Sequence, residues 1–312
     1  MQFTGPLMAK GYEDTFLYSY SNFISNNEVG SSANISGITV NELHELMIER
    51  QKNWNLSLSA SSTHDTKRGE DTRAKLNVLS EIPELWFEII REWSNLNEAI
   101  RHNNIPDRNE EYFIYQTLLG SFPFEEDLTW SDRLCDYMIK ALREAKIHST
   151  WNNPDKEYED SITTFIKGAL NNSAFNKSLK DFNEYISKQS VINSLSQTIL
   201  KITLPGIPDF YQGSELWDFK FVDPDNRTNP DYEKRTKFLN EIGQHSDPVE
   251  FLKEFSDGKI KLWVIKTLLS ERIKMKTYSI RRYLHCKGWQ HAIDNALQKY
   301  TRYLSYVQVF HK

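Results

Sequence analysis

Residues 61–73, SSTHDTKRGEDTR, are the most informative stretch of this 312-residue chain. They follow a short alternation of apolar and polar residues, Trp54 to Leu58, which is typical of a strand, and they lead into a helical pattern. A His-Asp pair at the end of a strand, followed by Lys-Arg and Glu-Asp, concentrates polar groups where α/β enzymes place their reacting side chains. Charged strand-to-helix turns are also common, so the stretch alone is weak evidence for a catalytic site.

A second polar segment lies roughly 140 residues later and strengthens this interpretation. Residues 204–218 read LPGIPDFYQGSELWD, and residues 223–227 read DPDNR. The prolines fix φ and the glycines permit tight turns, so carboxylates, an amide and aromatic rings can point outward. Carboxylates and amides suit sugar hydroxyls, and rings cover the apolar faces of a sugar. A role of the Asp-Pro-Asp-Asn run in shaping the loop explains it almost as well.

Composition restricts the class of protein. The chain is 39% hydrophobic and 13% aromatic, enough for the core of one large or two medium domains. Its net charge of −5 gives no general attraction to nucleic acid or anionic membranes, so neither is expected as a partner. Cys135 and Cys286 lie far apart and fit free thiols in a reducing compartment. The start lacks a signal peptide and no apolar run approaches about 18 residues, so we expect a cytoplasmic protein.

Hydrophobic periodicity predicts a mainly α-helical chain with few strands. Thr39 and Glu42 have the spacing of a capping box, which predicts a helix from there to about Asn53. Strands are expected at 55–62 and within 200–210. Further helices are expected at 13–24, 67–80, 83–103, 107–120, 127–147, 155–170, 176–187, 189–202 and around 262–269. Because a β/α repeat would place a strand roughly every 30 to 40 residues, the long strand-free block indicates an all-helical insertion or subdomain.

Together these segments resemble the maltooligosyltrehalose synthase family of the α-amylase-like glycoside hydrolase superfamily. His64-Asp65 and the run from Pro208 to Glu215 resemble the superfamily. Lys67-Arg68 after that pair, and the DPDNR run, resemble the synthases in particular. Residues 4–15 and 27–30 fit the same family, and the resemblance spans about residues 3–272.

The resemblance implies the C-terminal part of a (β/α)8 barrel that carries a large all-helical insertion between strands 7 and 8. His64-Asp65 would lie at the C-terminal end of strand 7, and residues 208–215 just after strand 8. Residues 1–82 would then be a partial barrel around strand 7, and residues 83–190 the helical insertion subdomain. Residues 191–272 would hold the strand 8 region and the following helix, and residues 273–312 a divergent or truncated tail.

The implied activity is that of an isomerase, a (1→4)-α-D-glucan 1-α-D-glucosylmutase of trehalose biosynthesis. It converts the reducing-end α-1,4 linkage of a maltooligosaccharide into an α,α-1,1 (trehalose) linkage by intramolecular transglucosylation. Retaining chemistry needs a nucleophilic carboxylate and an acid/base roughly 5 Å apart, and in this superfamily strands four and five supply them. Asp65 matches a third carboxylate, which stabilises the transition state. The other two would lie upstream of Met1, so we expect the chain alone to be inactive.

The resemblance also implies substrate-binding residues. His64 would donate to the same sugar as Asp65, and a reducing-end pocket would be built by Lys10, Lys67, Arg68, Tyr211, Gln212 and Glu215. For each of them a structural role at the barrel lip is about equally compatible with the sequence. Arg73, Asp223, Asp225 and Arg227 are expected to fix loops around the site. No cofactor and no metal are expected.

Two features depart from the family. The first half of the barrel has no counterpart, and the family pattern ends at about Arg272, where a basic, aromatic tail begins. A truncated or frame-shifted reading frame would explain both. We interpret the tail as a solvated helix or a non-native end rather than as an arm for an anionic partner.

Two other functions remain open. One is a non-catalytic half-barrel, either a remnant or a subunit that complements the missing N-terminal half. The other is a metal phosphohydrolase with a His-Asp pair, which would need further His and Asp ligands. The remaining histidines show no ligand spacing in the sequence: His44, His102, His148, His245, His285, His291 and His311.

Overall fold

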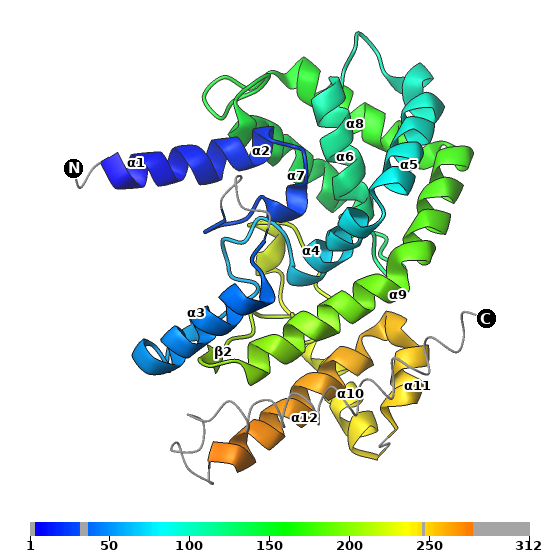
Figure 1. The fold of residues 1–312 in the computed structure, drawn as a ribbon. Helices are drawn as coiled ribbons and strands as arrows, with labels where there is room; N and C mark the ends of the chain where they lie inside the picture. The colour runs from blue at the N-terminus through cyan, green and yellow to red at the C-terminus, as the bar shows by residue number, and fades with distance from the viewer. Residues whose placement is uncertain (1–3, 32–36, 245–246, 277–312) are drawn as a thin grey trace.

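The computed structural model describes residues 4–31, 37–244 and 247–276, and this part of the chain is mainly helical, as predicted (Figure 1). Its only two strands are short, β1 (Leu58–Ser59) and β2 (Ile207–Pro208). The described α-helices are α1 (Thr4–Gly11), α2 (Leu17–Ser19), α3 (Val40–Asn53), α4 (Glu70–Asn77), α5 (Pro83–Asn97), α6 (Arg108–Ser121), α7 (Trp130–Ala145), α8 (Lys156–Asn171), α9 (Ser173–Thr203), α10 (Tyr232–Gln244), α11 (Pro248–Lys253) and α12 (Lys259–Lys276).

Local sequence signals explain where several helices begin. The Thr39 side chain accepts a hydrogen bond from the backbone N–H of Glu42, and the Glu42 carboxylate accepts one from the backbone N–H of Thr39. This confirms the predicted capping box of α3. Asp107 and Glu110 form the same arrangement at α6. Pro83 occupies the first turn of α5, where its missing N–H costs nothing.

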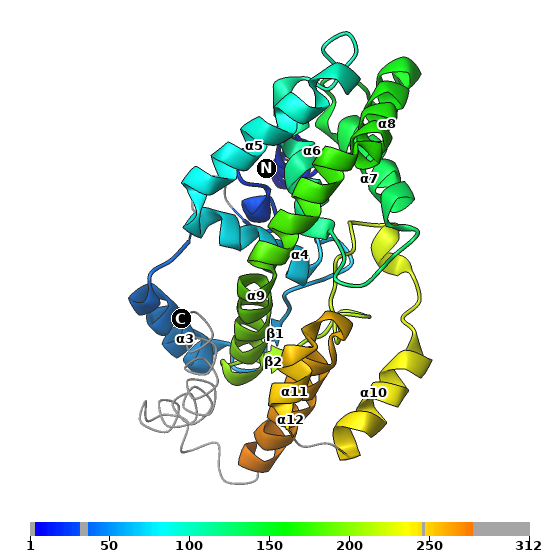
Figure 2. The same ribbon diagram turned by 90° about the vertical axis from the view of Figure 1, so that its right-hand side faces the viewer.

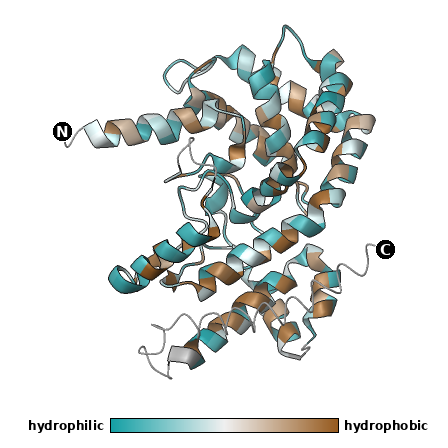
Figure 3. Cartoon of the chain, viewed as in Figure 1, coloured by the Kyte–Doolittle hydropathy of each residue, from teal (hydrophilic) through white to brown (hydrophobic). Residues whose placement is uncertain are grey.

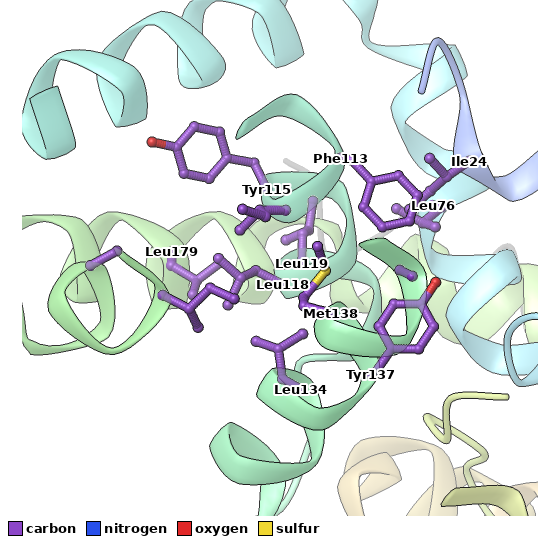
Figure 4. Packing of buried hydrophobic residues seen from close by; sticks show 14 of the residues in the cluster. Ile24, Leu76, Phe113, Tyr115, Leu118, Leu119, Leu134, Tyr137, Met138 and Leu179 are labelled. Atoms are coloured by element: carbon purple, nitrogen blue, oxygen red, sulfur yellow. The ribbon is translucent and has the colours of Figure 1, made fainter. Parts of the chain in front are cut away.

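Helices α5 to α9 surround a core rich in aromatic and aliphatic residues, part of which Figure 4 shows. Trp93 is fully buried there and meets Trp86 edge-on, with ring centroids 5.6 Å apart. Such pairs add to the free energy of burial because the edge of one ring faces the π-electrons of the other. The predicted Trp-rich helix therefore faces the core.

Helix α9 joins this block to a second, smaller core. It runs over 31 residues, about 46 Å at the usual helical rise, and Figure 2 shows it extending from the helical block to β2 and α12. Leu179 packs in the first core, whereas Val191 and Leu195 pack with α10, α11 and α12 in the second. The prediction of two separate helices was wrong, because neither Gly nor Pro interrupts residues 173–203.

The two strands run parallel, with Leu58 opposite Ile207 and Ser59 opposite Pro208. The backbone N–H of Ile207 donates to the carbonyl of Ser57 at 2.9 Å, and that of Asp209 donates to the carbonyl of Ser59 at 2.9 Å. Helices α4 to α9 separate the strands in sequence. Both strands are shorter than predicted. The first residues of the expected 200–210 strand belong to the end of α9 instead.

The described residues cover the two cysteines and the basic C-terminal tail only in part. Cys135 is buried and unpaired, whereas Cys286 and nearly all of the basic tail lie outside the described residues. None of the helices between residues 4 and 276 is both long enough and apolar enough to cross a membrane.

Candidate active site

The His64-Asp65 pair lies in the turn between β1 and α4, as the sequence pattern predicts. His64 is exposed, and the Asp65 side chain is 44% exposed. Two threonines shape the turn: the backbone N–H of Asp65 donates to Thr63 Oγ1 at 3.2 Å, and the Thr66 hydroxyl donates to the Thr63 carbonyl at 2.9 Å. The Asp65 carboxylate is therefore held in an ordered turn and remains accessible.

One asparagine joins this turn to the second polar segment. Asn226 Nδ2 donates to the backbone oxygen of His64 at 3.0 Å. Its own backbone oxygen accepts hydrogen bonds from the Tyr211 hydroxyl at 3.3 Å and from Gln212 Nε2 at 3.2 Å. Asn226 is only 5% exposed, so water does not compete for these bonds. The fold thus brings together the two segments that the sequence singled out, through a residue of the DPDNR run to which the sequence assigned no individual role.

A chain of opposite charges links Lys10 to Asp65. Lys67 Nζ lies 3.3 Å from Asp14 Oδ1 and 3.8 Å from Asp65 Oδ1, and Lys10 Nζ lies 2.7 Å from Asp14 Oδ2. Burial would raise the pKa of Asp14, but its hydrogen bonds to Lys10 and Lys67, together with their charges, outweigh that effect and lower it. Lys67 is buried and Lys10 is exposed.

Arg68 points into the interior. One guanidinium nitrogen donates to the backbone oxygens of Ile24 and Asn27, both at 3.2 Å, and another donates to the Tyr137 hydroxyl at 3.1 Å. Arg68 is 2% exposed, and its backbone N–H donates to the Glu28 carboxylate. The structure therefore encloses the Arg68 guanidinium in protein, whereas sequence reasoning placed it in a sugar pocket.

Glu215 is held by α10. Arg235 Nε lies 3.1 Å from Glu215 Oε2, and a second guanidinium nitrogen of Arg235 donates to the backbone oxygen of Gly213 at 2.8 Å. Gly213 has a φ of +91°, a conformation that favours glycine. This turn carries the chain from Tyr211 and Gln212 to Glu215.

The four residues expected to fix loops all make polar contacts. Arg73 donates to the backbone oxygen of Ser61, and Asp225 pairs with Arg133 at 2.7 Å. Asp223 and Arg227 form an ion pair with each other.

A buried ionic cluster lies at the start of α4, five residues after Asp65. Lys261 Nζ of α12 is 2.7 Å from Glu70 Oε1 and 2.7 Å from Asp71 Oδ2. Lys201 of α9 lies 3.2 Å from Glu70 Oε2, and the backbone N–H of Asp218 donates to Asp71 Oδ2 at 2.6 Å. All five residues are at most 7% exposed. The cluster ties the helix after the His64-Asp65 turn to α9, to α12 and to the segment after Glu215.

Charges and burial compete in this cluster. Burial would raise the pKa of Glu70, but the Lys261 and Lys201 charges outweigh it and hold the pKa at about 2. Burial, together with the Glu70 charge, raises the pKa of Asp71 despite Lys261. Burial and the neighbouring Asp71 and Glu70 raise the pKa of Asp218 to about 6. Periodicity could not reveal these contacts, because Lys201 and Lys261 lie more than a hundred residues from α4.

The fold also brings one histidine near acidic groups, which the sequence spacing did not indicate. His148 Nε2 is 3.2 Å from Asp107 Oδ2 and 3.9 Å from Glu110 Oε1, within reach of a shared ion. Asp107 and Glu110 already cap α6, and the Tyr158 hydroxyl donates to Glu110. These contacts account for the three side chains without an ion.

Comparisons with known proteins identify the relatives. No family model matches the chain. A curated protein of Mycobacterium tuberculosis, provisionally named maltooligosyl trehalose synthase, is 35% identical over 246 residues, which are 78% of this chain and 31% of that protein. A crystal structure of a maltooligosyl trehalose synthase superposes with a TM-score of 0.79 at 40% identity and covers 86% of this chain. The chain is related to the maltooligosyl trehalose synthases.

A second solved structure agrees. The maltooligosyltrehalose synthase from Arthrobacter ramosus superposes with a TM-score of 0.77 at 31% identity, covering 87% of this chain and 34% of that one. The predicted resemblance to these synthases is therefore confirmed. The chain spans about a third of the length of the maltooligosyl trehalose synthases it matches.

Proposed function

We propose that the chain is one part of a maltooligosyl trehalose synthase and contributes Asp65 to its active site. The complete site would convert the reducing-end α-1,4 linkage of a maltooligosaccharide into an α,α-1,1 linkage, as an isomerase of trehalose biosynthesis. The relation to the synthases, at 35–40% identity over most of this chain, carries the proposal. The free thiol of Cys135 is in keeping with a cytoplasmic location.

In this proposal β1 and β2 are strands 7 and 8 of a (β/α)8 barrel. Their parallel pairing supports it, because neighbouring strands of such a barrel run parallel. Residues 83–190 would be the helical insertion between them, residues 1–82 and 191–272 the flanking barrel segments, and residues 273–312 a divergent or truncated tail. The His64-Asp65 turn would then lie at the C-terminal end of strand 7, where barrel enzymes place catalytic groups.

Asp65 would stabilise the transition state. Cleavage of a glycosidic bond passes through an oxocarbenium-like state, in which the sugar ring gains positive charge and changes shape. A fixed carboxylate beside that ring binds the distorted state better than the ground state and so lowers the barrier. The ordered, half-exposed position of Asp65 supports this role, and Lys67 at 3.8 Å would orient its carboxylate.

The reducing-end pocket would be formed by His64, Lys10, Lys67, Tyr211, Gln212 and Glu215. The link through Asn226 supports a common site for the 64–65 turn and residues 211–212. Arg68 receives a different role in this proposal, since its guanidinium is bonded in the interior. It would hold the turn from beneath rather than touch the sugar.

Turnover would also require the rest of a synthase. A retaining mechanism uses a nucleophile and an acid/base roughly 5 Å apart, and the family resemblance assigns both to strands that precede this segment. The chain by itself is therefore expected to be inactive. The pocket must also hold the glucose that cleavage frees and keep water away from it, and forming that pocket would likewise require the rest of a synthase.

An assay of Asp65 variants in a completed enzyme tests the proposal. The chain is combined with a polypeptide that covers the part of the M. tuberculosis relative outside the matched 246 residues. Asp65→Asn should lower the rate of trehalose-linkage formation by about a hundredfold or more, the usual loss when a transition-state contact is removed. The exposed Asp160→Asn serves as the matched control and should leave the rate unchanged.

Two results would contradict the proposal. Full activity of an assembly that carries Asp65→Asn would show that the Asp65 carboxylate takes no part in the reaction. An assembly that forms but is inactive with the unaltered chain would favour the alternative of a non-catalytic half-barrel.

A further inference from the structure

We propose that α3, the turn at residues 54–57 and the β1–β2 sheet form a docking face for the rest of a synthase polypeptide. This inference rests on the proposed function only for the identity of the partner. We call this region the α3–sheet face. Its exposed apolar side chains are Val40, Leu46, Ile48, Trp54, Leu56, Leu58 and Ile207.

Helix α3 lacks the burial that a helix of its length needs. It has 14 residues and a capping box, yet none of its residues is buried. A helix this short is marginal in water, because most of the stability of such helices comes from packing an apolar side. Figure 1 places α3 apart from α5, α6, α7 and α8, and Figure 3 colours parts of it as hydrophobic. The exposed apolar side chains of α3 therefore need a partner that buries them.

A single arginine connects the end of α3 to the sheet. Arg50 donates to the backbone oxygen of Leu58 at 2.9 Å and to Ser59 Oγ at 2.8 Å. Because the carbonyls of Ser57 and Ser59 face β2, the backbone of Leu58 faces the opposite, outer edge of β1. The helix and the outer edge thus form one continuous surface.

The sheet itself is incomplete as a stable unit. Leu58 and Ile207 are opposite each other in register, so their side chains lie on the same face of the sheet. They are 68% and 40% exposed. A two-stranded sheet is marginal in water unless a further strand or a helix covers its apolar face. In the described part of the chain, no further strand joins this sheet.

The comparisons indicate which partner fits. The solved synthases match 85–88% of this chain, and yet that match accounts for only 34–36% of their own residues. The unmatched residues are a polypeptide large enough to cover a helix and a sheet face. Helix α3 carries three acids, Glu42, Glu45 and Glu49, against two bases, Arg50 and Lys52, so it lacks the excess of positive charge that would suit an anionic membrane.

Binding measurements with face variants test the inference. The 312-residue chain is titrated with separately produced polypeptides that cover the unmatched parts of two synthases, the M. tuberculosis relative and the 40%-identical crystallised one. We expect a one-to-one complex with at least one of them. Leu56→Glu and Leu58→Glu should each raise Kd at least tenfold. The control Leu128→Glu introduces the same charge at a residue that is 86% exposed in the turn before α7, and it should leave Kd within twofold.

Several outcomes would overturn the inference. These are no complex with either polypeptide, a complex whose Kd is the same for face and control variants, or self-association of the chain that the face variants abolish. Circular dichroism of each variant checks that the chain still folds, and Leu56 lies in a turn, so its variant does not depend on strand formation. A complex that forms normally but shows no turnover would refute the proposed function while leaving the docking face intact.

Discussion

Asn226 donates a hydrogen bond from its side-chain nitrogen to the backbone oxygen of His64 at 3.0 Å, across 162 residues of sequence. The same residue accepts hydrogen bonds from Tyr211 and Gln212 through its backbone oxygen. One buried residue therefore links the two segments of the candidate site directly, in addition to the β1–β2 pairing and the ionic cluster. A change at Asn226 should be felt at the His64-Asp65 turn, although no atom of Asp65 is altered.

Asn226→Ala removes the side-chain donor to His64 and keeps the backbone acceptor. We expect a loss of about 1 kcal/mol in the free energy of unfolding, the usual worth of such a hydrogen bond. Amide hydrogen exchange at residues 63–67 should become faster, because the turn loses its contact with the second segment. The exposed Asn153→Ala is the control and should change neither. Unchanged exchange at residues 63–67 would show that Asn226 does not hold the turn.

Lys261→Met leaves Glu70 and Asp71 buried without their shared cation. Breaking a buried ion pair from one side typically costs about 3–5 kcal/mol, so this variant should be strongly destabilised in urea unfolding. Lys274→Met on the exposed part of the same helix should change stability by less than about 0.5 kcal/mol.

A combined variant shows whether the loss comes from unpaired charge. Adding Glu70→Gln and Asp71→Asn to Lys261→Met removes the buried negative charges and should recover part of the lost stability. A single variant as stable as the unaltered chain, or a combined variant no better than the single one, would mean that the cluster does not secure α4.

Titration of the Asp218 carboxyl should make the free energy of unfolding depend on pH. Its folded pKa of about 6 lies above the usual value of 3.8, so between these values the folded state binds more protons than the unfolded state. Stability attributable to this carboxyl is therefore greatest below about pH 4 and falls as the pH rises towards 6. The difference between the two pKa values corresponds to roughly 3 kcal/mol.

Asp218→Asn removes that titration. The gain in stability of the variant over the unaltered chain should grow between pH 4 and pH 6.5 and then level off. Glu70 acts in a different range, because its folded pKa of about 2 means that its contribution is lost only as the pH falls below about 4.5. A difference between variant and unaltered chain that is flat from pH 4 to 7 would contradict the assignment to Asp218.

Arg68→Lys separates a structural from a sugar-binding role. Lysine cannot reproduce the planar set of donors that reaches Ile24, Asn27 and Tyr137. We expect a loss of about 2 kcal/mol or more in unfolding free energy, against little change for the exposed Arg91→Lys. Unchanged stability combined with weaker maltooligosaccharide binding would show that Arg68 contacts the sugar and does not hold the fold.

The helices between residues 83 and 171 were predictable because their apolar residues recur at the helical period. The predicted ranges 107–120 and 155–170 differ from α6 and α8 by about one residue at each end. The break predicted at residue 188 was wrong, because one helix runs through Lys188 and on to Thr203. Ser190 is buried in the structure, in a helix that contacts α4 through Asn193 and Ser194. A polar residue buried by a tertiary contact carries no periodic signal.

Contacts between residues far apart in the sequence also limited what could be predicted of the candidate site. The two polar segments could be found from residue types, and their approach in space followed from the family resemblance. Lys261 and Tyr137 could not be found, because each acts through a partner that lies tens of residues or more away in the sequence. Asn226 was part of the DPDNR run, but its contact with His64 spans 162 residues and could not be predicted. Helices α10 and α11 were missed since only a few apolar residues, such as Phe238, Ile242 and Phe251, mark their buried sides.

Proton NMR of a maltopentaose digest shows whether the α,α-1,1 linkage forms and which polypeptides are needed for it. The purified 312-residue chain is assayed alone and after addition of the rest of a synthase, and the α,α-1,1-linked product is followed by its anomeric signals. We predict that the chain alone yields none of this product and that the completed assembly yields it. Formation of the trehalose linkage by the chain alone would show that its 312 residues already hold a complete active site.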